Sequence, residues 1–257
     1  MAMRASNKIK LIAFDLDGTL SESKSPITPK MASMLRELLR RYHVAVTSGQ
    51  KFSRFQKQLI NRLKASPGQL KYLHILPTNG NQYFRYDIDK KRWQRIYFLE
   101  MPVAERKRIT KKVKTTAKRL GLWVRNPRGK IIEDRGSQIT FSALGQKALL
   151  KPKKAWDPKK IKRRRLRTAL AKILPGYATK TAGTTSIDIT AVGLNKAAAI
   201  TRLKDILGLT KSDLMYVGDA LGPGENDAVV KAAGFKTIGV KGPTETAERI
   251  SKLLEGY

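Results

Sequence analysis

Residues 9–19 read Ile-Lys-Leu-Ile-Ala-Phe-Asp-Leu-Asp-Gly-Thr, and this stretch decides the fold. A near-continuous apolar run over 9–14 is typical of a strand that is buried on both faces of a parallel sheet. Asp15 and Asp17 follow at its end, where burying acids is costly unless they have a use. Gly18 then allows a sharp turn. We therefore expect a buried strand that delivers two carboxylates to the carboxyl edge of a sheet.

Helical and extended patterns alternate on either side of a central insert. Thr28-Pro29 offers a helix N-cap followed by proline at the first helical position, and apolar residues follow at helical spacing up to Leu39. Further helices are predicted over 52–63, 196–207, 227–233 and 244–254, and further strands over 44–47, 74–76, 214–217 and 237–240. This alternation predicts an α/β fold with a doubly wound parallel sheet, in which ligands bind at the carboxyl ends of the strands.

The insert has a different pattern. A hairpin is predicted over 83–86 and 93–98, basic helices over 103–120 and 159–174, and strands over 131–133, 138–142 and 185–190. Two helices over an antiparallel sheet form a separate α+β unit. We therefore expect a discontinuous core domain, residues 1–84 and 189–257, into which residues 85–188 are inserted as an α+β domain.

The composition restricts the possible chemistry. The 257 residues contain no cysteine, which excludes disulfides, zinc–thiolate sites and cysteine nucleophiles. His43 and His74 are the two histidines, too few for a multi-histidine metal site. The polar start of the chain and the lack of an apolar run of roughly 18 residues predict a soluble, cytoplasmic protein with no membrane partner. The oligomeric state is left open.

Paired carboxylates two residues apart suit a divalent cation, because Mg²⁺ accepts carboxylate and phosphate oxygens. One of the two, Asp15 or Asp17, can also attack phosphorus while the other protonates the leaving oxygen. An acidic turn that merely follows a strand is the alternative for any single Asp-Gly pair. The full string with its strand favours the catalytic interpretation.

Polar residues at other predicted element ends fit the same chemistry. The Thr47-Ser48-Gly49 segment can bind a phosphate oxygen, although Ser-Gly after a strand is more often a simple turn. Lys196 opens a helix, where it either opposes the helix dipole to serve a bound phosphate or is a solvated surface lysine. Asp219 follows a strand, and Asp227 either completes a metal's oxygen shell or caps the next helix.

Together these pieces resemble the haloacid dehalogenase superfamily. The strings FDLDGTL and VAVTSG, then Lys196, then GDALGPGENDAVV occur in the order and spacing of its four motifs, and the likeness covers essentially the whole chain. The strings IEDRGSQITFSALGQ and TTSIDIT resemble the strands of the large cap of the type IIB group. That group includes phosphomannomutase-like proteins and sugar-phosphate phosphatases, so the resemblance implies a Rossmann-like core with a cap.

The resemblance implies a role for each matching residue. Asp15 would be the nucleophile, and Asp17 the general acid/base that also binds Mg²⁺ through its carbonyl. Ser48, or as second choice Thr47, would hydrogen-bond the phosphoryl group. Lys196 would neutralise that group and orient Asp15. The predicted Mg²⁺ site consists of Asp15, Asp17, Asp219, Asn226 and Asp227.

The cap departs from the mutase pattern at one position. Phosphomannomutases resemble one another in carrying Ile-Gly-Arg where this chain has Leu144-Gly145-Gln146. The arginine would hold a second phosphate, and glutamine lacks its charge. We therefore expect a phosphatase acting on small phosphate monoesters, in particular sugar phosphates, with a phosphomannomutase or phosphoglucomutase as the alternative. Predicted substrate contacts in the cap, each of which has an ordinary surface or strand-edge role as its alternative, are Arg135, Gln146, Ser186 and Asp188.

The charge supports a rival. Lysines and arginines number 53 against 20 acids, and a net charge of +33 attracts polyanions. The basic run 151–172 has three consecutive arginines, 163–165, at its centre and also contains Trp156, and it is compatible with a nucleic-acid-binding protein built on the same fold. We favour a solvated basic surface with non-specific polyanion binding, because the charge is spread along the whole chain. The expected specific partner is a small phosphorylated substrate.

Overall fold

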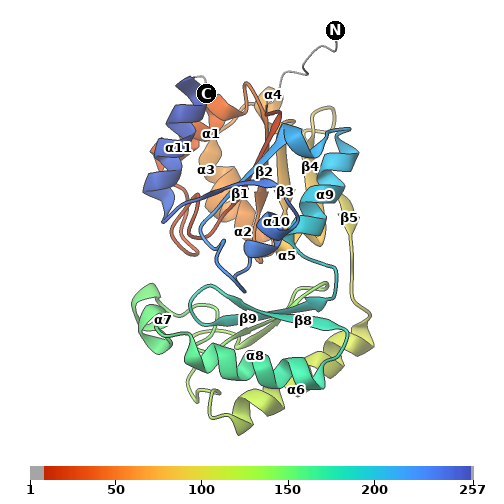
Figure 1. Cartoon of the computed structure of the whole chain (residues 1–257), viewed down its shortest axis with the longest axis vertical. Helices are drawn as coiled ribbons and strands as arrows, with labels where there is room; N and C mark the ends of the chain where they lie inside the picture. Colours follow the sequence, from red (N-terminus) through yellow and green to blue (C-terminus); the bar gives the residue numbers. More distant parts are fainter. Residues whose placement is uncertain (1–8, 256–257) are drawn as a thin grey trace. The chain divides into compact units, whose positions relative to one another are not determined.

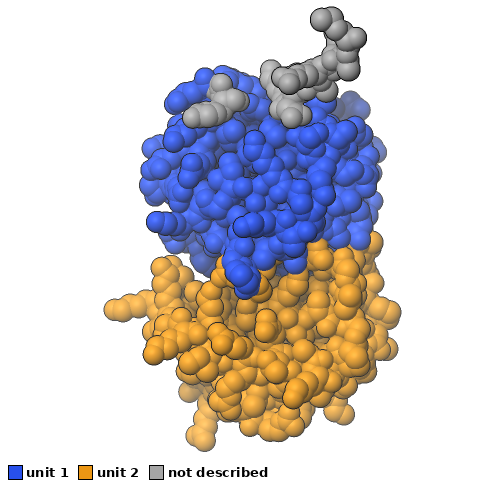
Figure 2. All heavy atoms as spheres, viewed as in Figure 1, with its two compact units in different colours: residues 1–97, 196–223, 227–257 blue, residues 98–195, 224–226 orange. Residues whose placement is uncertain are grey.

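The computed structural model describes residues 9–255, which form two compact units (Figures 1 and 2). Unit 1 holds the described residues up to Tyr97, Lys196–Pro223 and the residues from Asp227 onward, and unit 2 holds Phe98–Asn195 and Gly224–Asn226. Residues 1–8 and 256–257 of the predicted core lie outside the described residues. Among the helices that residues 9–255 form, none combines the length and apolar character of a membrane span.

A seven-stranded sheet forms the centre of unit 1, in the order β11-β10-β1-β2-β3-β4-β5. The first five strands of that order run parallel, and β4 pairs with β3 in the antiparallel direction. The strands are β1 (Leu11–Asp15), β2 (His43–Thr47), β3 (Leu73–Leu76), β4 (Gln82–Asp87), β5 (Arg92–Phe98), β10 (Leu214–Gly218) and β11 (Lys236–Gly239). The predicted doubly wound sheet is confirmed.

Helices cover both faces of this sheet, which explains the unbroken apolar run of β1 (Figure 1). Ile12 and Phe14 belong to a core shared with α1 (Pro29–Leu38) and α11 (Pro243–Glu255). Leu11 belongs to a second core, shared with α9 (Lys196–Ile206) and α10 (Ala228–Ala232). Neighbouring residues of a strand point to opposite faces, so both sets must be apolar.

Short elements complete unit 1. The predicted helix 52–63 consists of α2 (Phe52–Phe55), a π-helical segment η1 (Gln56–Ile60) and α3 (Asn61–Leu63). Within the π-helical segment, the carbonyl of Gln58 accepts a hydrogen bond of 2.9 Å from Ile27 N, a residue outside the helix. Helices depart from the regular α pattern where a group from elsewhere takes part in their hydrogen bonding. The remaining elements are α4 (Pro67–Leu70), the turn-like α5 (Pro77–Gly80) and the 3₁₀-helix η2 (Lys211–Asp213).

The β4–β5 hairpin extends the central sheet. The sequence-based division assigned residues from 85 onward to the insert, whereas the structure keeps the chain in unit 1 up to Tyr97. The physical reason is long-range pairing, since β4 places Phe84 opposite Ile75 and Arg85 opposite His74 of β3.

Unit 2 is an α+β unit with a four-stranded antiparallel sheet, in the order β6-β7-β9-β8. Its elements are α6 (Val103–Arg119), β6 (Ile132–Asp134), β7 (Ile139–Ser142), α7 (Leu150–Trp156), α8 (Ile161–Ile173), β8 (Tyr177–Ala182) and β9 (Ser186–Ala191). Phe141 and Ile187 of the sheet share a buried core with Ile109 of α6 and Leu166 of α8. The alternate residues of β7 and β9 are polar, so the other face of the sheet carries polar side chains.

Candidate active site

Polar residues lie at or directly after the ends of three adjacent parallel strands of unit 1, at one edge of the sheet. Asp15 ends β1 directly opposite Thr47 of β2, and Asp219 follows β10 on the other side of β1. This is the edge at which doubly wound sheets bind ligands. The sheet topology therefore brings together residues that lie far apart in the sequence.

Lys196 connects two of the buried acids. It is the first residue of α9, and its Nζ donates to Asp15 Oδ1 and to Asp227 Oδ1, each at 2.6 Å. Lys196 is only 1% exposed, so it is not the solvated surface lysine that the sequence left open. A buried cation between two carboxylates is a preorganised electrostatic arrangement.

Burial governs the ionisation of this cluster. It raises the pKa of Asp15 well above the ordinary value, and although Lys196 opposes this shift, the charges of Asp227 and Asp219 add to it. For Lys196, burial works toward a lower pKa, but Asp15 and Asp227 outweigh it and hold the pKa above its ordinary value. Three acids beside one lysine thus leave an excess of negative charge that a further cation would offset.

Asp227 acts as the anchor of Lys196. Its Oδ1 also accepts the Tyr216 hydroxyl at 2.6 Å, and its Oδ2 accepts Ala220 N at 3.2 Å. Asp227 precedes α10, but its side chain makes no capping hydrogen bond, so the capping alternative is wrong. Burial, followed by the charges of Asp227 and Asp15, raises the pKa of Tyr216 well above its usual range, and the phenol therefore stays a donor.

The carboxylates suit a hard divalent cation. Oxygens of Asp15, Asp219 and Asp227 lie within 4.8 Å of one another, and an all-oxygen donor set is typical of Mg²⁺ sites. Both oxygens of Asp227 already accept hydrogen bonds, so Asp15 and Asp219 are the better direct ligands. Asn226 groups with unit 2 and stays a prediction.

The turn after β1 is fitted to Asp219. Thr19 Oγ1 donates to Asp219 Oδ1 at 3.2 Å. Gly18 has φ +94°, and a Cβ there would lie 2.5 Å from Asp219 Oδ2. Only glycine suits both the angle and the close approach. Thr19 contacts the site although the sequence analysis did not select it.

Asp17 has neutral hydrogen-bond donors around its carboxylate. Ser48 Oγ donates to Oδ2 at 2.9 Å, Lys24 N donates to Oδ1 at 2.6 Å, and Gln50 Nε2 donates to both oxygens at 3.0 and 3.1 Å. Ser48 therefore contacts the predicted acid, and its predicted phosphoryl contact stays a prediction. Thr47 Oγ1 is buried and has no hydrogen-bond partner among the described residues.

A family model for haloacid dehalogenase-like hydrolases matches residues 12–229, which include every residue of this carboxylate site. The chain belongs to the haloacid dehalogenase-like hydrolase family. Family membership confirms the predicted superfamily and the prediction of a hydrolytic enzyme.

Relatives of this haloacid dehalogenase-like hydrolase span nearly its whole length. A probable phosphomannomutase of Caenorhabditis elegans is 24% identical over 268 residues, 99% of each chain. A truncated Plasmodium falciparum IMP-nucleotidase has a TM-score of 0.71 at 18% identity, covering 96% of this chain and 70% of that one. A haloacid dehalogenase-like hydrolase from Bacteroides thetaiotaomicron has a TM-score of 0.63 at 18% identity, covering 96% and 100%. At such identities the structural likeness shows the fold.

Unit 2 of the hydrolase holds the predicted substrate residues on or beside its sheet. Ser186 Oγ lies 2.8 Å from Ser142 Oγ, and Asp188 Oδ1 accepts Thr140 Oγ1 at 2.7 Å. Their roles toward a substrate stay predictions.

Arg135 and Gln146 are the two other predicted substrate contacts, and they have different hydrogen-bond partners. Arg135 is ion-paired with Glu133 at 2.8 Å, so it is not part of a general basic surface. Gln146 lies in the turn after β7, where its backbone N donates to Lys130 O at 3.0 Å. Their substrate contacts also stay predictions.

The basic run of the hydrolase is divided between interior and surface. Arg163 is buried, and its Nε donates to Asp157 Oδ2 at 2.9 Å. Arg164 and Arg165 are exposed on α8. Arg163, the first of the three consecutive arginines, therefore has a structural role, while non-specific polyanion binding by its two neighbours stays a prediction.

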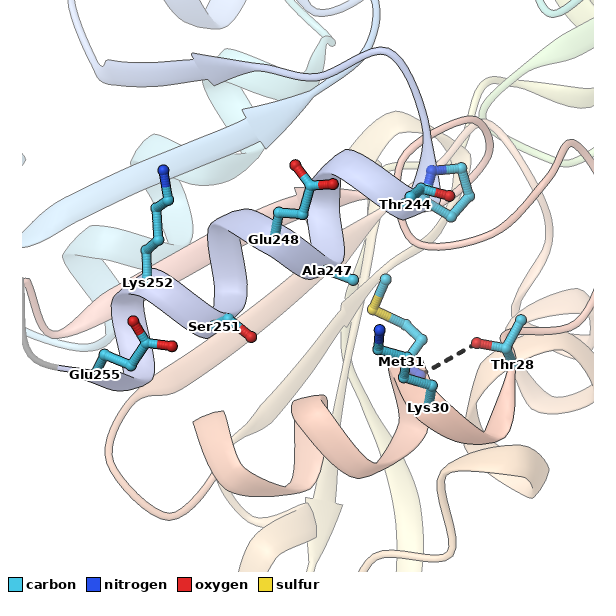
Figure 3. Close-up of a pocket in the computed structure, with 10 residues that line it drawn as sticks. Thr28, Lys30, Met31, Thr244, Ala247, Glu248, Ser251, Lys252 and Glu255 are labelled. Atoms are coloured by element: carbon cyan, nitrogen blue, oxygen red, sulfur yellow. Dashed lines mark hydrogen bonds between the residues drawn. The ribbon is translucent and has the colours of Figure 1, made fainter.

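A groove of about 640 Å³ lies between α1 and α11 of the hydrolase (Figure 3). Met31 and Ala247 lie along it, with the charged side chains of Lys30, Glu248 and Lys252. Its lining includes none of the carboxylates of the candidate site. The groove is therefore separate from the chemistry described above.

Proposed function

We propose that this chain is a Mg²⁺-dependent phosphatase that hydrolyses small phosphate monoesters, in particular sugar phosphates, in the cytoplasm. The observation that carries the proposal is the buried contact of 2.6 Å between Lys196 and Asp15, with Asp219 nearby. A carboxylate held by a buried cation at the carboxyl end of a parallel strand is suited to attack phosphorus.

The reaction has two steps, each with a defined proton transfer. An Asp15 oxygen attacks phosphorus, the P–O bond to the alcohol breaks, and Asp17 donates a proton to the departing oxygen. Water then attacks the phosphorus of the aspartyl-phosphate and gives a proton to Asp17, which releases phosphate and restores both carboxyl groups. Lys196 balances the charge on the phosphoryl oxygens throughout.

Mg²⁺ fits the residues present. Asp15, Asp219 and the main-chain carbonyl of Asp17 would hold it, with Asn226 as a further candidate and Asp227 oriented toward Lys196. When bound, the ion supplies positive charge that offsets the charge on the transferring phosphoryl group. A cation held there would also offset the charges of Asp227 and Asp219, which add to the effect of burial in raising the pKa of Asp15.

The polar face of the unit 2 sheet supports a hydroxylated substrate. Ser186, Asp188 and Thr140 offer hydroxyl and carboxylate groups that suit hydrogen bonding to a sugar. We propose Ser186 and Asp188 as sugar contacts, and Arg135 and Gln146 as further substrate contacts of unit 2. The names of the relatives, a phosphomannomutase and an IMP-nucleotidase, are consistent with a phosphorylated small molecule.

A mutase is the second candidate, favoured by the full-length likeness to the Caenorhabditis elegans protein. A mutase must hold a bisphosphate in two orientations, and a bidentate arginine suits the distal phosphate. Gln146 offers only neutral donors at the position where the arginine is expected. Hydrolysis is therefore the better-supported outcome.

Product analysis separates the two candidates. The protein is first screened over sugar phosphates with Mg²⁺ and with excess chelator, and then incubated with mannose 1-phosphate and a bisphosphate activator. We expect free phosphate to form faster than mannose 6-phosphate, and Gln146→Arg to move the ratio toward isomerisation. Faster isomerisation than hydrolysis by the unmodified protein would establish the mutase instead.

A further inference from the structure

Gln50 contacts the predicted general acid, although neither the motif match nor the sequence analysis assigns it a role. Its Nε2 lies 3.1 Å from Asp17 Oδ1 and 3.0 Å from Asp17 Oδ2. It thus spans the edge of the carboxylate, whereas Ser48 Oγ and Lys24 N each contact one oxygen. Of these three donors, the Gln50 amide is the one that contacts both oxygens and so restrains rotation of the carboxyl group.

The backbone fixes Gln50 in this position. Its side chain is almost entirely buried, with 7% of the residue exposed. Its N–H donates to Ser48 Oγ at 3.2 Å, and its carbonyl accepts Thr78 N at 2.9 Å. The Ser48 carbonyl accepts Asn79 N at 2.9 Å, so the turn after β3 holds the whole segment 48–50.

That turn has an unusual backbone. Thr78 has φ 52° and ψ 48°, and Asn79 has φ 56° and ψ 31°. Left-handed angles are unfavourable for a β-branched residue, and such conformations persist where the surrounding structure fixes them. Here the two strained residues are the ones whose N–H groups point to segment 48–50. The strained turn thus holds Ser48 and Gln50 through their carbonyls, and the side chains of these two residues in turn hold Asp17.

We propose that Gln50 is a positioning residue that aims the Asp17 carboxyl group for proton transfer to the leaving oxygen. The proposal rests on the proposed phosphatase function. The neutral amide of Gln50 holds the carboxyl group by hydrogen bonds to both of its oxygens and adds no net charge beside it. Lys196 provides the opposite environment for Asp15.

The test uses leaving groups that need the proton to different degrees. Gln50→Leu and Gln50→Glu are assayed with Mg²⁺ on p-nitrophenyl phosphate, phenyl phosphate and glucose 6-phosphate. We expect Gln50→Leu to lower kcat about tenfold on glucose 6-phosphate and less than about twofold on p-nitrophenyl phosphate, with KM unchanged. Gln50→Glu should lose at least as much, because its carboxylate faces Asp17.

Gln58→Leu is the matched control. Gln58 is a buried glutamine in the same unit whose Nε2 donates to Ser25 O at 3.0 Å. Its loss should affect stability without changing the leaving-group dependence. Equal losses on all three esters, or full activity of Gln50→Glu, would overturn the role of Gln50 alone. If the unmodified protein hydrolyses none of the esters, Asp17 has no proton to deliver, and both this role and the phosphatase fail.

Discussion

Asp15 and Asp17 are two residues apart, yet their surroundings differ in almost every respect. Asp15 is buried against a cation, in a chain of hydrogen bonds that continues through Lys196 to Asp227 and the phenol of Tyr216. Asp17 is partly exposed and receives neutral donors from Ser48, Gln50 and a backbone N–H. The difference teaches that environment can divide two like carboxylates into a nucleophile and a proton carrier.

The most severe test of the comparison is removal of the nucleophile. Asp15→Asn should lower kcat by on the order of 10⁵-fold or more, because an amide does not form the aspartyl-phosphate. Phosphate release in excess Mg²⁺ is the measurement, with circular dichroism to show that the variant is folded. Turnover near that of the unmodified protein would end the assignment of Asp15.

Replacement of Asp17, the proposed general acid, should cause a smaller loss of activity that depends on the leaving group. Asp17→Asn should reduce turnover by about 10²–10⁴-fold, since that is the usual contribution of general acid catalysis. The loss should be larger for alkyl phosphates than for p-nitrophenyl phosphate, whose leaving group needs little protonation. Equal slowing of both esters would remove the distinction between the two carboxylates.

The proposed Mg²⁺ site includes Asp15 but not the carboxylate of Asp17, so loss of a metal ligand tests the environment of Asp15. Asp219→Asn should weaken Mg²⁺ binding by about 100-fold, because a direct carboxylate ligand is lost. In the unmodified protein, Mg²⁺ at about a hundred times its Kd should stabilise the fold by about 2.7 kcal/mol, seen as a rise in Tm. The exposed Asp205→Asn controls for net charge and should keep that rise. An undiminished rise in Asp219→Asn would contradict the proposed ligand.

The smallest effect is expected at Tyr216, the residue of this hydrogen-bonded chain that is farthest from Asp15. Tyr216→Phe removes one donor from Asp227 and should lower kcat about tenfold without changing KM, because Lys196 loses part of its orientation. Tyr83→Phe is the matched control, since it removes another buried phenol hydroxyl, 2.8 Å from His74 Nδ1. If the two variants lose the same activity, Tyr216 acts only through stability.

Much of the fold was visible in the sequence because local signals agree with it. Strand β1 is apolar at every position before Asp15, as burial on both faces requires. Thr28-Pro29 marked the start of α1, and Thr28 Oγ1 does accept Met31 N at 3.2 Å. The acids and Lys196 stood at predicted element ends, where a parallel sheet brings such positions together.

Other elements had no clear local signal. Strand β8 is half-buried along its whole length and lacks the alternation of apolar and polar residues that marks a strand. Helix α7 is short and contains Pro152, which disfavours a helix when read from the sequence. The hairpin was predicted, but its pairing with β3 depends on contacts between distant segments.

The supporting residues of the site were hidden for the same reason. Tyr216 reads as one more large residue of an apolar strand, and Gln50 as part of a turn. What gives them a role is the sheet register that sets β10 beside β1 and the turn after β3 that holds segment 48–50. Both features depend on tertiary contacts between distant segments. The sequence therefore predicted the reacting groups better than the groups that orient them.

The most direct test of the division between Asp15 and Asp17 is to trap the intermediate. Asp17→Asn is mixed with p-nitrophenyl phosphate and Mg²⁺, quenched in acid, and mapped by peptide mass spectrometry while p-nitrophenol is followed. We predict a burst of about one p-nitrophenol per protein and a phosphoryl group on Asp15, because the second step lacks its base. Steady p-nitrophenol release with no phosphoryl group on Asp15, or with the group on another residue, would contradict the account.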